Sequence, residues 1–367
     1  MASQEDVHKP KPVPAPGRPE TNRHERYVQQ QLRRGAAMAP ERAATPEYVR
    51  DVILKDIDRS HGPDADWTVE FLHKARDSWL FRASGPPAPW PLAVKVYCSA
   101  MPQTLPARQL TALQRYHAAM ASKPGLTVQA PWAALPQHRT LIMEWIDAPR
   151  VDKLLMRVDR RPERDRIMAA AGGWLKHFHD SGEQSLLPLK DVDLLQPVDT
   201  YLGEQGGANA RDLVFRAAYR VLQESAQGLA DTKIPFVMAH GDFSPGNLFH
   251  APERTVGFDF KANLARPAIR DIMHFLVYAR AFNTPTWMLL TSDVDRRDLD
   301  AFLGAYGTLG GAMDDRLVTV FLLAEALQSW SHLLDRIRRE GSNIRRMARA
   351  WRLRNLAKRA VRSLERA

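Results

Sequence analysis

The chain has 367 residues, of which 44% are apolar and 26% charged, and its formal net charge is +10 at pH 7. This length exceeds the usual size of one hydrophobic core, so we expect two lobes. The single cysteine, Cys98, excludes an intrachain disulfide, and neither a secretion signal nor an apolar run of ~18 residues is recognisable. We therefore expect a cytoplasmic protein.

The excess positive charge is confined to the C-terminal end. Residues 336–367 contain 12 Arg and Lys against two Glu, which accounts for the whole +10. The first 335 residues are neutral overall, so their charge gives no indication of nucleic-acid binding.

The N-terminal part alternates between polar and β-rich stretches. Residues 1–45 are predicted to be a disordered tail, because prolines recur between Pro10 and Pro19 and no apolar core follows. A helix is predicted at 46–60, with Thr45 as its N-cap. The next elements are expected in this order: strands at 67–72, 79–83 and 92–97, a helix at 105–121, and strands at 128–135 and 140–145. A small antiparallel sheet carrying one helix accounts for them.

After residue 146 the pattern is mainly helical. Helices are predicted at 164–178, 212–223 and 316–339, with short strands at 235–238, 247–249 and 256–260 between the last two. The chain is therefore predicted to be α+β. We divide it into a tail at 1–45, a nucleotide-binding lobe at 46–146, a helical catalytic and acceptor lobe at 147–340, and a basic helical tail at 341–367.

The stretch at 240–260, HGDFSPGNLFHAPERTVGFDF, holds the groups that phosphoryl transfer requires. Asp242 and Asn247 have the D-x-x-x-x-N spacing that places a base and a metal ligand at the two ends of one tight loop. Asp259 returns one β-hairpin later, and Mg²⁺ typically takes one or two protein carboxylates with phosphate oxygens. Lys95, in the middle of the strand LAVKVY, supplies a cation for the phosphates.

HGDFSPGNLF followed by VGFDF resembles the catalytic signature of the aminoglycoside phosphotransferase and choline kinase-like family, over roughly residues 60–335. The resemblance implies a bilobal protein kinase-like fold and transfer of phosphate from ATP, with Mg²⁺, to a hydroxyl of a small molecule. It implies these roles: Asp242 as catalytic base, Asn247 and Asp259 as Mg²⁺ ligands, Lys95 on the phosphates, Glu144 and Ile146 of the hinge at 143–146 on adenine, and His240 and Asp271 as supports of the catalytic loop.

Three positions depart from the family pattern. Gln109 stands where a glutamate is expected to pair with Lys95, the phosphate loop at 73–78 has no glycine, and Ala148-Pro149 replaces the glycine after the hinge. A catalytically weak or inactive kinase-like binding protein therefore stays open as the alternative. The acceptor is not readable and is expected to be an aminoglycoside, a sugar or glycan, or an amino alcohol.

The acidic run at 293–300 and the basic C-terminal tail are two further features of the sequence. The acidic run Asp293, Asp295, Asp298 and Asp300 lacks the glycine and glutamate of a calcium loop, so we expect a solvated acidic turn. The apolar residues of the basic tail lie on two opposite faces, which predicts two short helices or one helix packed differently at each end. The charge of residues 336–367 makes an anionic membrane surface a candidate partner, at the inner face of the membrane, whereas nucleic acid is disfavoured.

Overall fold

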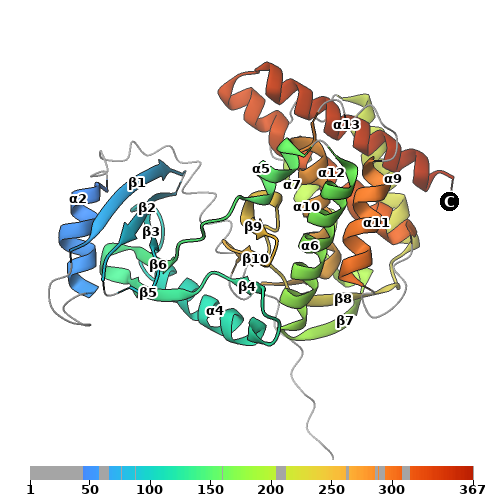
Figure 1. Cartoon of the computed structure of the whole chain (residues 1–367). Coiled ribbons are helices and arrows are strands. Elements are labelled where there is room, and N and C mark those ends of the chain that lie inside the picture. The colour runs from blue at the N-terminus through green and yellow to red at the C-terminus, as the bar shows by residue number, and fades with distance from the viewer. Residues whose placement is uncertain are drawn as a thin grey trace, which may run out of the picture.

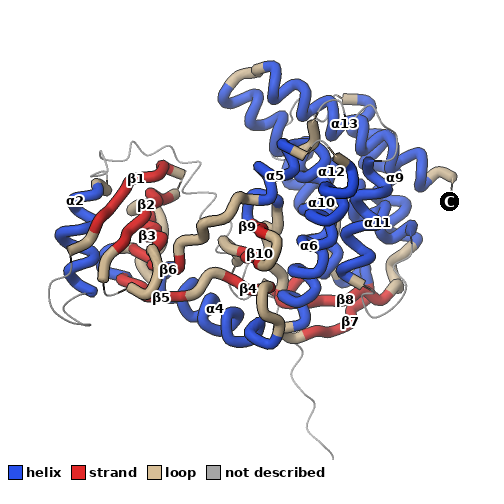
Figure 2. The backbone as a smooth tube through the Cα atoms, in the orientation of Figure 1, coloured by secondary structure: helices blue, strands red, loops and turns tan. Residues whose placement is uncertain are grey.

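The computed structural model describes residues 44–57, 66–75, 77–86, 88–158, 160–203, 212–261, 264–285, 288, 294–307 and 315–366. The tail predicted at 1–45 lies almost entirely outside these residues. Figure 1 shows a small lobe that is rich in strands and a larger helical lobe, with the strands β9 (Leu248–Ala251) and β10 (Arg254–Gly257) at the junction. The expected bilobal protein kinase-like architecture is confirmed. Figure 2 shows the same division, with helices dominating the larger lobe.

The small lobe is built on a five-stranded antiparallel sheet with the order β1-β2-β3-β6-β5. Its strands are β1 (Thr68–Lys74), β2 (Ser78–Ser84), β3 (Leu92–Tyr97), β5 (Pro131–Leu135) and β6 (Thr140–Glu144). Because side chains alternate along a strand, Val94 and Val96 face one side of β3, where they pack with Val49 and Ile53. Lys95 points to the opposite side, the side of Tyr97, which belongs to the core shared with the helical lobe.

Helices cover both faces of this sheet. The first turn, α2 (Pro46–Tyr48), continues into a wider turn at Val49–Leu54, and the Thr45 hydroxyl accepts a hydrogen bond from the Tyr48 N–H at 3.2 Å. This is the predicted N-cap. On the other face lies α4 (Leu105–Ala119), which packs on β5 and β6. These elements have the predicted type and order.

The strand predicted at 128–135 is wrong as one element, because the chain changes sheets there. β4 (Leu126–Val128) leaves the small lobe and pairs in parallel with β10 (Arg254–Gly257), which is also antiparallel to β9 (Leu248–Ala251). The Trp174 indole, on the first long helix of the large lobe, donates a 2.7 Å hydrogen bond to the Thr127 carbonyl. This contact fixes β4 to the helical lobe, so that both lobes are joined beside the catalytic strands.

The large lobe consists mainly of helices around one long apolar helix. The helices are α5 (Val151–Arg157), α6 (Arg161–Asp180), α7 (Gln196–Gly203), α9 (Leu213–Gly228), α10 (Ala268–Phe282), α11 (Val294–Tyr306), α12 (Asp315–Glu340) and α13 (Ile344–Leu364), and a sheet with the order β11-β8-β7 is formed by β7 (Gln184–Pro188), β8 (Lys233–Met238) and β11 (Ala265–Pro267). Among the described residues, α12 alone is long and apolar enough to cross a membrane, but 67% of its apolar window is buried. It packs against α9, α10 and α13 as a core helix.

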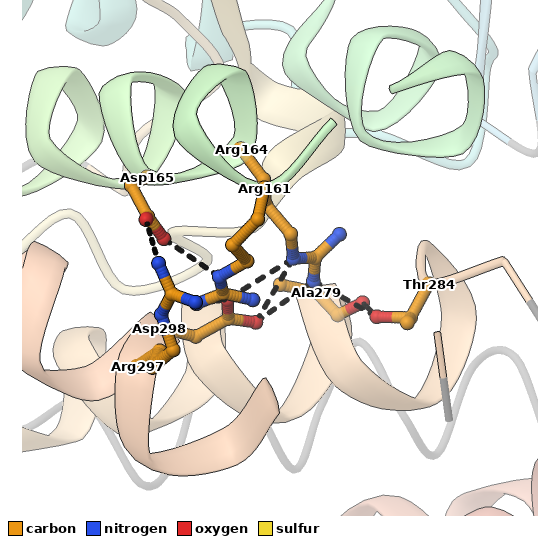
Figure 3. Close-up of polar contacts among 7 residues, drawn as sticks. All are labelled: Arg161, Arg164, Asp165, Ala279, Thr284, Arg297 and Asp298. Atoms are coloured by element: carbon orange, nitrogen blue, oxygen red, sulfur yellow. Dashed lines mark hydrogen bonds and ion pairs between the residues drawn. The ribbon is translucent and has the colours of Figure 1, made fainter. Parts of the chain in front are cut away.

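A buried ion pair joins α6 to α11 (Figure 3). The Arg164 side chain is fully buried and donates to both carboxylate oxygens of Asp298, at 2.8–3.2 Å, and to the Thr284 hydroxyl at 2.9 Å. Arg161 approaches the same carboxylate at 2.8 Å. The expectation of a solvated acidic turn is therefore wrong for Asp298, because an arginine from a helix far away in sequence needs a buried counter-ion. Asp293 lies outside the described residues.

The basic tail forms one helix, α13, which is packed differently at its two ends. Leu353, Leu356 and Ala357 are buried against the helical lobe, whereas Met347 and Trp351 are exposed by 53% and 61%. Of the two arrangements expected for the tail, the single helix with two different faces is therefore the one observed.

Candidate active site

The loop that follows β8 is held by one buried carboxylate. Asp271, in the first turn of α10 and 3% exposed, accepts hydrogen bonds from the backbone N–H groups of His240 at 2.6 Å and Gly241 at 3.0 Å, and its Oδ2 lies 3.1 Å from His179 Nε2. Gly241 has φ +81°, a left-handed conformation that favours glycine. The His240 ring is fully buried and packs against the rings of Trp174 and Phe243, which stack on each other. Asp271 thus binds the backbone of the loop at His240 and Gly241, and the His240 side chain is directed into a cluster of aromatic rings.

Both carboxylate oxygens of Asp242 have a partner. Asn247 Nδ2 donates to Asp242 Oδ2 at 3.2 Å and to the Asp242 carbonyl at 2.8 Å, which closes the loop. On the other side, His274 Nε2 of α10 lies 3.2 Å from Asp242 Oδ1, and His274 Nδ1 lies 2.8 Å from Glu325 Oε1. Burial opposes the charged imidazole, but Glu325 and Asp242 outweigh it and raise the pKa of His274 to about 10. Sequence reasoning missed His274 and Glu325, because nothing near either residue marks them as partners of Asp242.

Asp259 follows β10 and faces the small lobe. Its φ of +61° is unusual for a residue other than glycine, and such strain is often retained at functional sites. Lys95 Nζ donates to Asp259 Oδ1 at 2.8 Å, although the two residues are 164 positions apart. Burial alone would raise the pKa of Asp259, but the Lys95 ammonium holds that pKa below its ordinary value. Burial likewise opposes the charge on Lys95, and the Asp259 carboxylate nevertheless raises the pKa of Lys95.

The Gln109 side chain, at the position where a glutamate was expected to pair with Lys95, contacts Tyr97 instead. Its Oε1 accepts a hydrogen bond from the Tyr97 hydroxyl, and the Lys95 ammonium lies 5.1 Å from the centroid of the Tyr97 ring. The ring face attracts the cation, so Tyr97 and Gln109 together support the side of Lys95 where a glutamate was expected. Burial raises the pKa of Tyr97 to about 12, so its hydroxyl stays a hydrogen-bond donor at neutral pH.

The hinge residues line a cavity of about 400 Å³ between the lobes. Ile146 and Met143 contribute to this lining, together with Lys95, Asn247 and Asp259. Asp77, from the short connection between β1 and β2, lines the same cavity, whereas Arg76 of the predicted phosphate loop lies outside the described residues. Asp242 lies next to Asn247, beyond the lining. The structure thus brings Lys95, Ile146, Asn247 and Asp259 together around one cavity, whereas Glu144 is not among the lining residues.

Glu144 uses its side chain to connect the lobes. Its carboxylate forms a bidentate pair with Arg254 of β10, at 2.7 and 2.8 Å, and its carbonyl accepts a 2.9 Å hydrogen bond from Gln129 Nε2. Gln129 is 5% exposed and also lines the cavity. The Glu144 carbonyl oxygen, which belongs to the hinge expected to bind adenine, therefore already accepts one hydrogen bond from the protein. A carbonyl oxygen has two lone pairs, so it can accept a second hydrogen bond. Neither Gln129 nor Arg254 was predicted from the sequence.

The oxygens near the cavity fit a magnesium ion. Asn247 uses its amide nitrogen on Asp242, which leaves its Oδ1 as the available donor, and Asp259 contributes a carboxylate that is 43% exposed. No group of three His, Cys, Asp or Glu side chains that could hold a metal exists within the described ranges. This is compatible with Mg²⁺, which keeps several waters and takes phosphate oxygens with few protein ligands.

Comparisons with known proteins identify the fold. No family model matches the chain, and no curated protein resembles it in sequence. Three solved structures illustrate the likeness. A choline/ethanolamine kinase family protein from Mesorhizobium loti has 16% identity and a TM-score of 0.55, over 93% of this chain and 100% of that one. Amicoumacin kinase hAmiN, in complex with AMP-PNP, Ca²⁺ and Ami, has 14% identity and a TM-score of 0.53, over 93% of this chain and 96% of that one. Choline kinase LicA from Streptococcus pneumoniae has 15% identity and a TM-score of 0.51, over 87% of this chain and 100% of that one. At these identities the likeness confirms the fold.

Proposed function

We propose that this chain is a phosphotransferase that moves the γ-phosphate of ATP to a hydroxyl group of a small molecule. The observation that carries the proposal is the convergence of Lys95, Asn247 and Asp259 on one inter-lobe cavity, with Asp242 next to Asn247. These groups come from two parts of the chain that are far apart in sequence, β3 and the stretch at 240–260. The fold supports the same conclusion, because the structures it resembles are named as small-molecule kinases.

In this proposal each residue has a distinct task. The cavity binds ATP, with adenine next to Ile146 and the phosphates next to Lys95. Glu144 would meet adenine through the hinge backbone, because its carboxylate is paired with Arg254. Asn247 Oδ1 and the Asp259 carboxylate are the oxygens that would hold Mg²⁺, which supplies charge neutralisation on the phosphates when it is bound.

The transfer itself requires little covalent chemistry from the protein. Asp242 orients the acceptor hydroxyl and takes its proton while the new oxygen–phosphorus bond forms. The bond between the γ-phosphorus and its bridging oxygen breaks at the same time, and ADP leaves with that oxygen. Asn247 and His274 hold the two carboxylate oxygens of Asp242, so its orientation is set before the acceptor arrives.

Substitution of the base tests the assignment directly. Asp242→Asn retains the shape of the side chain and removes its basicity, so turnover should fall by about 10²- to 10⁴-fold. The assay measures ADP release across a panel of sugars, amino alcohols and aminoglycosides with labelled ATP. Turnover equal to that of the unaltered protein would remove Asp242 from the role of base.

A catalytically weak or inactive binding protein is the second candidate, and Gln109 is the observation that favours it. With Gln109 hydrogen-bonded to Tyr97, no acid of α4 pairs with Lys95. Titration of thermal stability with ATP and Mg²⁺ separates the candidates, because a ligand that binds only the folded state raises Tm. A shift that disappears in Lys95→Ala, together with ADP release, supports the enzyme; a shift without ADP release supports the binding protein.

The basic tail supports a separate proposal, that the protein associates peripherally with an anionic membrane surface from the cytoplasm. Ile344, Met347 and Trp351 form one exposed apolar stripe on α13, and arginines flank it. The test is co-sedimentation with phosphatidylglycerol vesicles and with phosphatidylcholine vesicles as a control. Met347→Ser with Trp351→Ser should abolish binding to the anionic vesicles. Unchanged binding of this variant, whose buried tail residues are intact, would contradict the proposal.

A further inference from the structure

A single row of half-buried side chains runs along α10. It consists of Arg270, His274, Tyr278 and Phe282, and every other position from 268 to 281 is buried. Residues four apart lie on one face of a helix, so the row is continuous. The ring centroids of His274 and Tyr278 are 4.4 Å apart, and those of Tyr278 and Phe282 are 4.8 Å apart. The row is therefore a narrow surface that leads away from Asp242.

The row connects the candidate active site to the basic helix. At its beginning, His274 contacts Asp242, and α10 packs against the loop at Pro245–Asn247. At its end, the Arg349 guanidinium of α13 lies 5.1 Å from the centroid of the Phe282 ring. From His274 to Phe282 the helix rises by about 12 Å, so a molecule that reaches both ends is larger than one sugar ring.

The carboxylates near the beginning of the row are each matched by a cation. His274 lies between Asp242 and Glu325, and Glu325 also interacts with Arg270. Arg270 donates a 2.7 Å hydrogen bond to the Asp193 carbonyl. A second guanidinium, that of Arg266, is close enough to add to the effect of burial in lowering the pKa of Arg270 to about 10. Among the described residues, the two carboxylates that contact the row, Asp242 and Glu325, thus face two cations, His274 and Arg270, and neither carboxylate is left unpaired to attract an ammonium group.

The aromatic faces of the row are also occupied by cations of the protein. The charged His274 ring stacks at a tilt on Tyr278, and Arg349 covers Phe282. A quaternary ammonium or an amino sugar is usually recognised by free aromatic faces or by unpaired acids. Neither is present along this row among the residues that the structure describes, whereas α13 contributes eight basic residues and no acidic one.

We infer that the acceptor is a hydroxylated molecule that carries a negative charge, such as a saccharide of about two rings with a carboxylate or phosphate. It lies along α10 with its reacting hydroxyl at Asp242 and its anionic group toward Arg349. This inference rests on the proposed phosphotransferase function and names the acceptor class for that site.

Three β-1,4-linked disaccharides that differ in charge test the inference: cellobionate, cellobiose and chitobiose, the dimer of glucosamine. ADP release by the full chain is measured with each in the presence of ATP and Mg²⁺. We expect kcat/KM for cellobionate to exceed that for chitobiose by about tenfold or more, with cellobiose between them. Arg349→Gln should reduce this ratio by at least threefold, whereas Arg296→Gln, an equal change of charge at an exposed position of α11, should leave it unchanged.

Each outcome bears on one proposal. Equal or better use of chitobiose, or no effect of cellobionate on ADP release, overturns the acceptor inference. A ratio that is insensitive to Arg349→Gln overturns the placement of the anionic group. If ATP with Mg²⁺ does not raise the Tm of the unaltered protein, the phosphotransferase proposal itself is overturned. Failure of the acceptor inference and failure of the phosphotransferase proposal are therefore distinguishable.

Discussion

The Asp271 carboxylate offers the sharpest test of how the catalytic loop is held. It receives the N–H groups of His240 and Gly241 and contacts His179, and it is 3% exposed. Asp271→Asn keeps one carbonyl oxygen but places an amide N–H against a second donor. Two charge-assisted hydrogen bonds are then lost, each worth about 1.5–3 kcal/mol, so we expect about 3–6 kcal/mol of destabilisation.

Urea unfolding and steady-state kinetics measure the two consequences of this substitution. The free energy of unfolding should fall as estimated, and kcat, corrected for the folded fraction, should fall at least about 100-fold because Asp242 is displaced. Asp300→Asn, an exposed i,i+4 partner of Arg296, is the control and should change stability by less than about 0.5 kcal/mol. A loss of stability below about 1 kcal/mol with unaltered kcat would refute the bracing role.

The pH dependence of Asp271 follows from the same contacts. Burial would raise the pKa of this carboxyl, but His179 and the backbone N–H groups outweigh burial and lower the pKa. A carboxyl whose pKa is lower in the folded state stabilises the protein above its unfolded pKa of about 3.9, and this contribution is lost as the pH falls through the folded value. Asp271→Asn should therefore lose less stability than the unaltered protein upon acidification below about pH 4.

Four further substitutions probe packing and the support of Lys95. Gly172→Ala sets a Cβ 2.2 Å from a backbone oxygen of α11 and should destabilise by about 1–3 kcal/mol, whereas Gly173→Ala, with no atom within 4 Å, should stabilise by up to about 1 kcal/mol in urea unfolding. Asp298→Ala leaves the buried Arg164 without its counter-ion and should cost about 3–5 kcal/mol in the same assay. Tyr97→Phe keeps the ring but loses the hydroxyl anchor, so KM for ATP should rise about threefold to tenfold; an unchanged KM would argue against that anchor.

The sequence by itself determined the elements whose signals are local. The strand predicted at 92–97 is observed with the same bounds, because its β-branched and aromatic residues fit a pleated surface that is buried on both faces. The spacing of Asp242 and Asn247 is also local, since a turn of five residues brings their side chains into contact. Such features depend on neighbouring residues only, and the resemblance to a known catalytic signature rests on them.

Tertiary structure decided the partners that lie far apart in the chain. Gln109 binds Tyr97 rather than Lys95, and Lys95 reaches Asp259 across 164 positions. Asp298 is buried because Arg164 of another helix requires it. The hydrophobic periodicity of the sequence does not predict these pairings, because they depend on how complete helices and sheets pack. The stretch at 240–260 could therefore be recognised in the sequence by its resemblance to a known signature. The cations that surround it, from which we infer the charge of the acceptor, are brought there only by the folding of the chain.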